Sequence, residues 1–228
     1  MTTNQQHIAL FDFDKTLVDC NSANLWFRSE LRAGRLPFTY ALRIPWWTLQ
    51  YRLGTRNLER MFEGAFELAR GQAEAPMIEN VRLWYDSEIR HRARPGALAA
   101  LREHRAAGDR LVLATSSSQY IARLACESFG LDEFICTQLE LADGYFTGKL
   151  AANAMGPQKA ERVAEWAEAQ GVDLTQCTFY TDSITDLALL KRVGHPVAVN
   201  PDQRLLRTAR ELGWPVLDWG TATRQGHA

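Results

Sequence analysis

Two aspartates follow the first apolar run of the chain, in the stretch "HIALFDFDKTLVDC", residues 7 to 20. Asp12 and Asp14 are spaced i, i+2, and Thr16 comes two residues later. A carboxylate next to a buried strand is costly unless a cation or hydrogen-bond donors meet it. The two acids therefore either cap the end of a strand or form part of a metal and nucleophile site.

Three further groups of polar residues lie at the ends of apolar runs or at the start of a helix. Hydroxyl side chains end the run "RLVLAT", acidic side chains follow "CTFYT", and a lysine follows "GPQ". The members are Thr115, Ser116, Ser117 and Ser118; Asp182, Ser183 and Asp186; and Lys159. Because open parallel sheets bind ligands at the carboxyl ends of their strands, we expect these groups to converge on one sheet edge.

The residue types in this set predict phosphoryl transfer. Several carboxylates without histidine or cysteine suit a hard cation such as magnesium, Mg²⁺. A lysine and hydroxyl groups can hold the oxygens of a phosphoryl group. One carboxylate is then free to attack phosphorus and form an aspartyl-phosphate, while a second moves the proton of the leaving alcohol.

The elements that position these residues alternate along most of the chain. A buried strand is expected at 8–13, and a segment of helical character without strand patterns follows at 22–92. Thereafter the patterns predict strands at 110–115, 177–181, 197–199 and 216–218, and helices at 97–107, 118–129, 157–170, 184–192 and 202–212. The stretch "FICTQLELADGYFTGKL" predicts a hairpin that turns at Asp143-Gly144.

This alternation predicts an α/β fold with a doubly wound, mostly parallel, Rossmann-like core and an inserted all-α cap domain. The predicted core domain is 1–17 with 93–228, and the predicted cap is 18–92. A stripe at helical spacing predicts one amphipathic cap helix through Leu58, Met61, Phe62, Ala65, Phe66 and Ala69. We expect the tryptophans Trp26, Trp46, Trp47 and Trp84 to pack in the interior of this cap.

The composition excludes several classes of protein. With 26 basic and 27 acidic residues among 228, the chain lacks the basic footprint of a nucleic-acid binder. The four cysteines form no C-x-x-C pair, and "MTTNQQH" lacks signal-peptide features, so we expect a cytoplasmic protein with reduced thiols. The aromatic segment 36–54 is interrupted by Arg43, Pro45 and Arg52, so we expect no membrane span. A monomer or homodimer is expected.

The polar groups together resemble the four motifs of the haloacid dehalogenase (HAD) superfamily. "DFDKT" is similar to its D-x-D-x-T motif, and "LVLATS" is similar to its second motif, a strand that ends in serine or threonine. Lys159 stands where the lysine of the third motif is expected, and "FYTDSITD" resembles the fourth. The resemblance extends from about residue 8 to 218. The helical insertion is similar to the cap of the phosphoserine-phosphatase-like branch, subfamily IB.

The resemblance implies a role for each matching residue. Asp12 would be the nucleophile and a metal ligand, and Asp14 would be the general acid/base and offer its backbone carbonyl to the metal. The remaining roles implied are phosphate binding for Thr115 or Ser116 and Lys159, metal binding for Asp182, and support of the site for Asp186, Thr16 and Ser183. An acid at position 14 favours a phosphatase over a dehalogenase.

The substrate question rests on departures from the phosphoserine phosphatases. Asn21 stands where those enzymes carry a glutamate that binds the substrate ammonium group, and Thr185 stands where they carry asparagine. The second motif reads Thr-Ser-Ser instead of Ser-Gly-Gly. These differences count against phosphoserine, and "TDSITDLALL" resembles a wider group of the same branch that includes enzymes for histidinol phosphate and other small phosphomonoesters. Histidinol phosphate is therefore ranked first as the small phosphorylated substrate, with phosphoserine as the alternative. Asn21, Arg56 and Arg60 are the candidate specificity residues.

Two rival functions remain open at this level. A phosphotransferase or mutase would use the same phospho-aspartate and pass the phosphoryl group to a second alcohol. A non-catalytic binding module would have no need for Asp12, Asp14, Lys159 and Asp182 together. We interpret His91, His104 and His195 as structural or surface residues because they show no triad or metal-ligand spacing.

Overall fold

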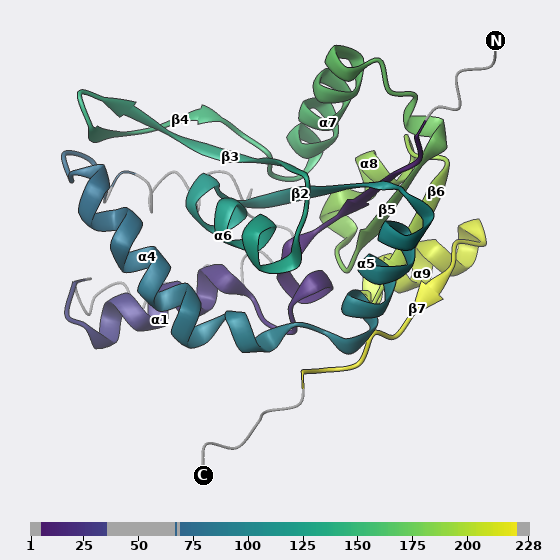
Figure 1. Ribbon diagram of the computed structural model, residues 1–228, viewed down its shortest axis with the longest axis horizontal. Coiled ribbons are helices and arrows are strands. Elements are labelled where there is room, and N and C mark those ends of the chain that lie inside the picture. The colour runs from purple at the N-terminus through teal and green to yellow at the C-terminus, as the bar shows by residue number, and fades with distance from the viewer. Residues whose placement is uncertain (1–5, 36–66, 68, 223–228) are drawn as a thin grey trace.

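A seven-stranded sheet with helices on both faces forms the centre of the computed structural model, which describes residues 6–35, 67 and 69–222 (Figure 1). The strand order is β4-β3-β2-β1-β5-β6-β7. The strands are β1 (Ile8–Phe11), β2 (Arg110–Ser118), β3 (Glu133–Ala142), β4 (Tyr145–Ala152), β5 (Cys177–Thr181), β6 (His195–Val199) and β7 (Val216–Leu217). Every neighbouring pair is parallel except the β3–β4 hairpin, which confirms the predicted fold class.

The helices begin and end close to the predicted boundaries in the part that follows the insertion. They are α1 (Ser22–Arg32), α4 (Glu74–Glu88), α5 (Pro95–Ala107), α6 (Gln119–Phe129), α7 (Pro157–Gln170), α8 (Leu187–Leu190) and α9 (Gln203–Leu212). Short helical turns are η1 (Phe13–Leu17), η2 (Arg90–Arg92), η3 (Leu174–Gln176) and η4 (Ile184–Asp186). The predicted helix 184–192 is wrong in part, because it is divided into η4 and α8 at Asp186.

Strand β1 is buried on both faces, as expected for the central strand of a parallel sheet. Ala9 and Phe11 pack into one core cluster with residues of α4, α5 and α6. Ile8 and Leu10 point to the other face and pack with residues of α7, α8 and α9. The predicted strand 8–13 is too long by two residues, because the backbone turns into η1 after Asp12. This turn brings the first acidic pair to the carboxyl edge of the sheet.

The β3–β4 hairpin turns at the predicted Asp143-Gly144 pair, where both residues have positive φ, 52° and 80°. Positive φ at both central residues is the geometry that Asp-Gly favours in a two-residue hairpin turn. The hairpin also pairs with the segment that leads into α4. Gly71 N donates to Phe146 O at 2.8 Å, and Glu74 N donates to Gly144 O at 2.9 Å.

Helices α1 and α4 lie beside each other next to the sheet (Figure 1). The rings of Trp26 and Trp84 meet edge to face, with 5.2 Å between their centroids. Trp84 is buried and Trp26 is partly buried against the core cluster that contains Phe11 of β1. Trp46, Trp47 and the stripe from Leu58 to Phe66 lie outside the described residues. Val18 and Ala93 form an antiparallel bridge where the chain leaves and re-enters the sheet region. The extent of the cap, 18–92, stays a prediction.

The cysteines Cys20, Cys126, Cys136 and Cys177 are all free thiols, in agreement with the expected absence of disulfides. Among the described helices, none is long and apolar enough to cross a membrane.

Candidate active site

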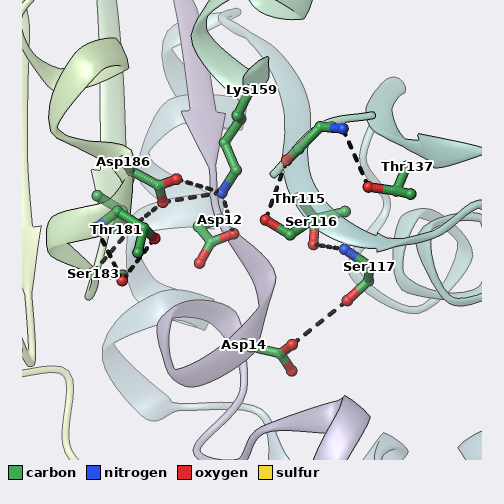
Figure 2. A network of polar contacts seen from close by, with 12 residues as sticks. Asp12, Asp14, Thr115, Ser116, Ser117, Thr137, Lys159, Thr181, Ser183 and Asp186 are labelled. Atoms are coloured by element: carbon green, nitrogen blue, oxygen red, sulfur yellow. Dashed lines mark hydrogen bonds and ion pairs between the residues drawn. The ribbon is translucent and has the colours of Figure 1, made fainter. Parts of the chain in front are cut away.

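Asp12 and Lys159 meet at the carboxyl edge of the sheet (Figure 2). Asp12 directly follows β1, and its amide nitrogen donates to the carbonyl oxygen of Tyr180 in β5 at 2.9 Å. Lys159 lies in the first turn of α7, which begins after Gly156, with φ of 55°, and carries Pro157 at its first position. The ammonium Nζ of Lys159 lies 3.0 Å from Asp12 Oδ1. Both side chains are more than 90% buried.

Asp186 accepts from the same lysine on its other side. Lys159 Nζ donates to Asp186 Oδ2 at 2.9 Å, and Thr181 Oγ1 donates to that oxygen at 2.7 Å. Asp186 is 1% exposed. Two buried carboxylates therefore share one ammonium group, and Asp186 fixes the lysine beside Asp12. Thr181, which ends β5, is a site residue that the sequence interpretation did not single out.

The pKa values of these groups follow from burial and from one another. Burial raises the pKa of Asp12 above its ordinary value, and the attraction of Lys159 offsets only part of that shift. Burial alone would lower the pKa of Lys159, but the Asp12 and Asp186 carboxylates outweigh it and raise the pKa. Lys159 therefore stays charged across the physiological range.

Asp182 follows β5 and is 6% exposed. Its closest ion pair is weak: the half-exposed Lys15 Nζ lies 4.0 Å from Asp182 Oδ2. Burial, with the neighbouring charge of Asp12, raises the pKa of Asp182 to about 8. A buried carboxylate that prefers to stay protonated near neutral pH is one that a cation would stabilise.

Asp14 points away from Lys159 and toward Ser117 at the end of β2 (Figure 2). Its Oδ1 accepts from Ser22 N at 2.6 Å, and its Oδ2 accepts from Ser22 Oγ at 2.9 Å. Ser117 Oγ lies 3.5 Å from the same Oδ2. Burial raises the pKa of Asp14, and the two hydrogen bonds from Ser22 partly oppose that shift.

Ser22 and Ser117 are further site residues that the sequence interpretation did not single out for Asp14. Ser22 directly follows Asn21 at the start of a helix, where serine is common for reasons of capping alone, so its type gave no distinct signal. Ser117 follows Thr115 and Ser116, and their neighbourhood was predicted as a hydroxyl cluster without distinct roles.

The hydroxyl groups at the end of β2 take separate partners. Thr115 is 1% exposed, and its Oγ1 accepts from Ser117 N at 3.1 Å. Ser116 Oγ donates to Ala154 O at 3.1 Å. Thr115 therefore orders the backbone at the end of β2, where its register with β3 shifts, whereas the Ser116 hydroxyl is directed to the segment before α7.

The supporting residues take structural positions. Thr16 is fully buried in η1, and its Oγ1 has no hydrogen-bond partner among the described residues. Ser183 caps η4 by accepting from Thr185 N at 3.3 Å. Asn21 caps α1, because its Oδ1 accepts from Asn24 N at 2.9 Å. Arg56 and Arg60, the other specificity candidates, lie outside the described residues.

His104 and His195 lie away from the acidic site. His104 Nδ1 lies 2.7 Å from Asp109 Oδ2, and its Nε2 lies 2.9 Å from Tyr180 Oη. Both ring nitrogens are thus engaged. The His7 ring lies 5.8 Å from the ring of His195, measured between centroids, beside strand β5. Asp12 follows the opposite end of β1, so these rings are separate from the acidic site.

The donor set fits a divalent cation bound by oxygen. Asp12, Asp182 and Asp186 are each less than 10% exposed, whereas Lys159 is the buried ammonium group that compensates two of them. Asp182 is left with one ion pair at 4.0 Å. Carboxylate and carbonyl oxygens without nitrogen or sulfur ligands are what Mg²⁺ prefers.

A family model described as haloacid dehalogenase-like hydrolase matches residues 9–191 of the chain. The matched range begins inside β1 and ends just after α8, so it contains Asp12, Asp14, Thr115, Lys159 and Asp182. The match covers most of the chain and all four groups of candidate site residues.

Three relatives align along nearly the whole chain. An "inhibition of morphological differentiation protein" of Streptomyces azureus is 33% identical, over 95% of this chain and 79% of that protein. Phosphoserine phosphatase SerB1 of Mycobacterium tuberculosis is 33% identical, over 95% of this chain and 72% of that protein. The histidinol-phosphatase of Neisseria meningitidis is 29% identical, over 94% of this chain and 99% of that protein.

Solved structures support the same fold. A protein of unknown function from Bordetella pertussis Tohama I superimposes with a TM-score of 0.86 at 28% identity, covering 94% of this chain and 99% of that chain. A phosphoserine phosphatase that holds a phospho-aspartyl intermediate analogue superimposes with a TM-score of 0.70, over 97% of both chains. At 19% identity this second likeness shows the fold alone.

Proposed function

Because the chain belongs to the haloacid dehalogenase-like hydrolase family and is a phosphoric monoester hydrolase, we propose that it hydrolyses a small-molecule phosphomonoester through a phospho-aspartate on Asp12. The observation that carries the proposal is the buried Asp12–Lys159–Asp186 group, with Asp14 on the same turn. It combines a fixed nucleophile, a fixed cation and a separate acid, which a binding module does not need.

In the first step an oxygen of Asp12 attacks phosphorus, and the bond from phosphorus to the alcohol oxygen breaks. Asp14 gives its proton to the departing alkoxide, so the alcohol leaves neutral. Asp14 suits this role because burial raises its pKa and so favours the protonated form that an acid needs. Lys159, with the hydroxyl or amide groups near Thr115, would hold the phosphoryl oxygens.

In the second step Asp14, now ionised, accepts a proton from water. The water oxygen attacks phosphorus, the bond to Asp12 breaks, and inorganic phosphate leaves. The hydrogen bonds from Ser22 would hold the Asp14 carboxylate at one place during both proton transfers. Asp186, through its contact with Lys159, would keep the ammonium group beside phosphorus.

A divalent cation, for which we propose Mg²⁺, would be held by the carboxylates of Asp12 and Asp182 and the backbone carbonyl of Asp14. Bound there, it would neutralise charge on the phosphoryl oxygens. The raised pKa of Asp182, a consequence of burial, supports this assignment, because metal binding would replace the proton with a cation.

For the substrate we rank histidinol phosphate first and phosphoserine second. Asn21 caps α1 with its amide oxygen and places no charge where phosphoserine phosphatases carry a glutamate, which counts against phosphoserine recognition of that kind. The relative named histidinol-phosphatase aligns over 99% of its own length. The relative named phosphoserine phosphatase is 33% identical to this chain and the relative named histidinol-phosphatase is 29% identical, so phosphoserine is kept as the second candidate substrate.

Residues 18–92 would act as a cap domain that opens to admit substrate and closes to exclude bulk water. We propose that the protein works in the cytoplasm as a monomer or homodimer on small phosphorylated metabolites. Nucleic acid is not an expected partner, because the chain carries a net charge of -1.

Phosphate release from a panel of small phosphomonoesters tests the proposal. The panel should contain histidinol phosphate, phosphoserine and a generic aryl phosphate, each with Mg²⁺ and with a chelator. Metal-dependent release without an added alcohol acceptor supports hydrolysis. Release that requires an acceptor would indicate a transferase or mutase, and no turnover of any ester with intact metal binding would indicate a binding module.

A further inference from the structure

Arg94 lies at the point where the chain re-enters the sheet region, one residue before α5. It is 7% exposed, and its amide nitrogen donates to Leu17 O at 2.9 Å. Its guanidinium Nε donates to Lys15 O at 2.9 Å, and its Nη1 donates to Gly220 O. In the described part of the chain Arg94 forms no ion pair, so its charge is directed at backbone carbonyl groups.

Lys15, which accepts the hydrogen bond from Arg94 Nε, has an unusual backbone conformation. It lies between Asp14 and Thr16 and adopts a left-handed backbone conformation, with φ of 58°. Residues with a Cβ seldom adopt this conformation, which persists where neighbouring contacts enforce it. Lys15 N donates to Cys20 O at 2.9 Å, and Lys15 O accepts from Arg94. Both peptide groups of Lys15 are therefore fixed from outside the turn.

The second anchor of the guanidinium group lies next to a buried tryptophan. Gly220 follows Trp219, which is 6% exposed and lies against Gly96, where a Cβ atom would come within 2.4 Å of Trp219 Cδ1. Gly96 N also donates to Trp219 O at 3.1 Å. Arg94 thus connects the turn that carries Asp12 and Asp14 to the C-terminal segment, at the residue that follows the buried Trp219.

We propose that Arg94 is a positioning residue for the phosphatase reaction, which holds the left-handed turn at Lys15 and thereby the relative placement of Asp12 and Asp14. The inference rests on the proposed function, because it assigns Arg94 to the turn that carries the proposed nucleophile and acid. Arg94 acts through the backbone of Lys15 and touches no reacting atom. A misplacement of catalytic groups by about 1 Å can cost roughly 100-fold in rate.

The variants Arg94→Ala and Arg94→Lys test the role, with turnover of an aryl phosphate as the readout. Lysine keeps the charge but cannot donate to both carbonyl groups from a planar fork. We expect kcat to fall roughly 10- to 100-fold in both variants, with KM within about threefold of the wild-type value, because the phosphate-holding Lys159 is untouched.

Arg105→Ala is a matched control. The Arg105 guanidinium also joins two backbone carbonyl groups, since its Nη2 donates to Phe129 O at 3.1 Å and to Gly130 O at 3.0 Å. It connects α5 to the end of α6, and its guanidinium group has no hydrogen bond to the turn that carries Asp12 and Asp14 among the described residues. We expect this variant to keep the kcat of the wild type.

Added guanidinium at millimolar concentration separates positioning from simple stabilisation. Partial recovery of kcat in Arg94→Ala, without a change in its Tm, supports positioning. The proposal is overturned if folded Arg94→Ala or Arg94→Lys keeps kcat within about twofold of wild type, or if kcat falls only in proportion to the unfolded fraction.

Hydrogen exchange gives a readout that does not depend on activity. In both Arg94 variants we expect faster amide exchange in the segment 12–18, including the Lys15 amide, than in the wild type or in Arg105→Ala. If the wild-type protein hydrolyses no phosphomonoester, the proposed function fails. The exchange measurement still tests whether Arg94 holds the turn at Lys15. Unchanged exchange in this segment would overturn the inference even if the enzyme is an active phosphatase.

Discussion

Lys159 Nζ lies 3.0 Å from Asp12 Oδ1, so the proposed nucleophile and the cation expected to hold the phosphoryl group form an ion pair before any substrate arrives. Asp186 accepts from the same ammonium group at 2.9 Å. The lysine therefore has two functions: it compensates buried negative charge in the resting protein, and it is in place for the phosphoryl oxygens.

Removal of this ammonium group should destabilise the metal-free protein. In Lys159→Met, Asp12 and Asp186 would remain buried without compensation, and we expect a loss of about 3–5 kcal/mol in the free energy of unfolding. Denaturant unfolding at neutral pH with a chelator measures it. The exposed Lys149→Met should change the free energy of unfolding by less than about 0.5 kcal/mol. Equal effects in the two variants would contradict the compensating role.

Asp12→Asn should abolish turnover, because an amide oxygen cannot form the phospho-aspartate. We expect kcat to fall on the order of 10⁴-fold or more. Phosphate release under single-turnover conditions is the measurement, with circular dichroism to verify folding. Asp143→Asn makes the same chemical change at the hairpin turn, where asparagine also tolerates positive φ, and should remain fully active. Metal-dependent turnover by Asp12→Asn near the wild-type rate would rule out the mechanism.

Asp14→Asn should leave metal binding largely intact while slowing both chemical steps. General acid–base groups contribute about 10²- to 10⁴-fold, so a fall of that size in kcat is expected. The backbone carbonyl proposed as metal ligand is unchanged by this substitution. Calorimetric titration with Mg²⁺ and burst kinetics separate the two effects, and a loss of metal affinity as the sole defect would refute the assignment.

Ser22→Ala should shift the pH dependence of the reaction. Removal of the 2.9 Å hydrogen bond from Ser22 Oγ raises the pKa of Asp14 further, because that bond favours the ionised form. The basic limb of kcat/KM, where Asp14 must be protonated to act as an acid, should move to higher pH. Ser87→Ala, which removes a serine hydroxyl bonded to Trp84 O on α4, should not move this limb. A shift to lower pH would contradict the prediction.

Metal removal should make the protein less stable at high pH. Burial raises the pKa of Asp182 to about 8 in the folded protein, from the ordinary value of 3.8, so the folded state binds more protons than the unfolded state between these values. The free energy of unfolding therefore falls as pH rises toward 8, by up to about 1.4 kcal/mol per pH unit for this group.

With saturating Mg²⁺ this fall should become smaller, because the cation replaces the proton and binds more tightly at higher pH. The Tm measured from pH 5 to pH 9 in chelator, in Mg²⁺, and in Asp182→Asn checks the prediction. The asparagine variant should lose the part of the pH dependence that Asp182 causes. A metal-free Tm that rises with pH up to 8 would oppose the assignment.

Local patterns were enough to predict the layers of the fold. Apolar runs and glycines predicted β5 and α7 with their observed bounds, and Asp143-Gly144 predicted the hairpin turn. The division of the predicted helix at Asp186 was missed, because the partners of that side chain, Lys159 and Thr181, are tertiary contacts that no helical pattern records.

The convergence of the acids and the lysine on one edge of the sheet was predictable, because carboxylate and ammonium groups are costly to bury unless they compensate one another. The residues that hold them were not predictable. Ser22 and Arg94 act by contacting Asp14 and Lys15 across 8 and 79 positions of sequence, and both are of types that are common at helix starts and on surfaces. Only the three-dimensional arrangement distinguishes them from ordinary capping and solvated residues.

The pairing of the β3–β4 hairpin with residues 71–74 affects how the enzyme would admit substrate. The hydrogen bonds from Gly71 to Phe146 and from Glu74 to Gly144 attach the start of α4 to the hairpin, in addition to the two connecting segments near Val18 and Ala93. Opening must either break these bonds or carry the hairpin along, with bending at the register shift between Gln138 and Leu139. In the second case the hairpin would move together with the cap, although it belongs to the sheet and lies outside the predicted cap, 18–92. The part that moves would then be larger than the cap defined from the sequence.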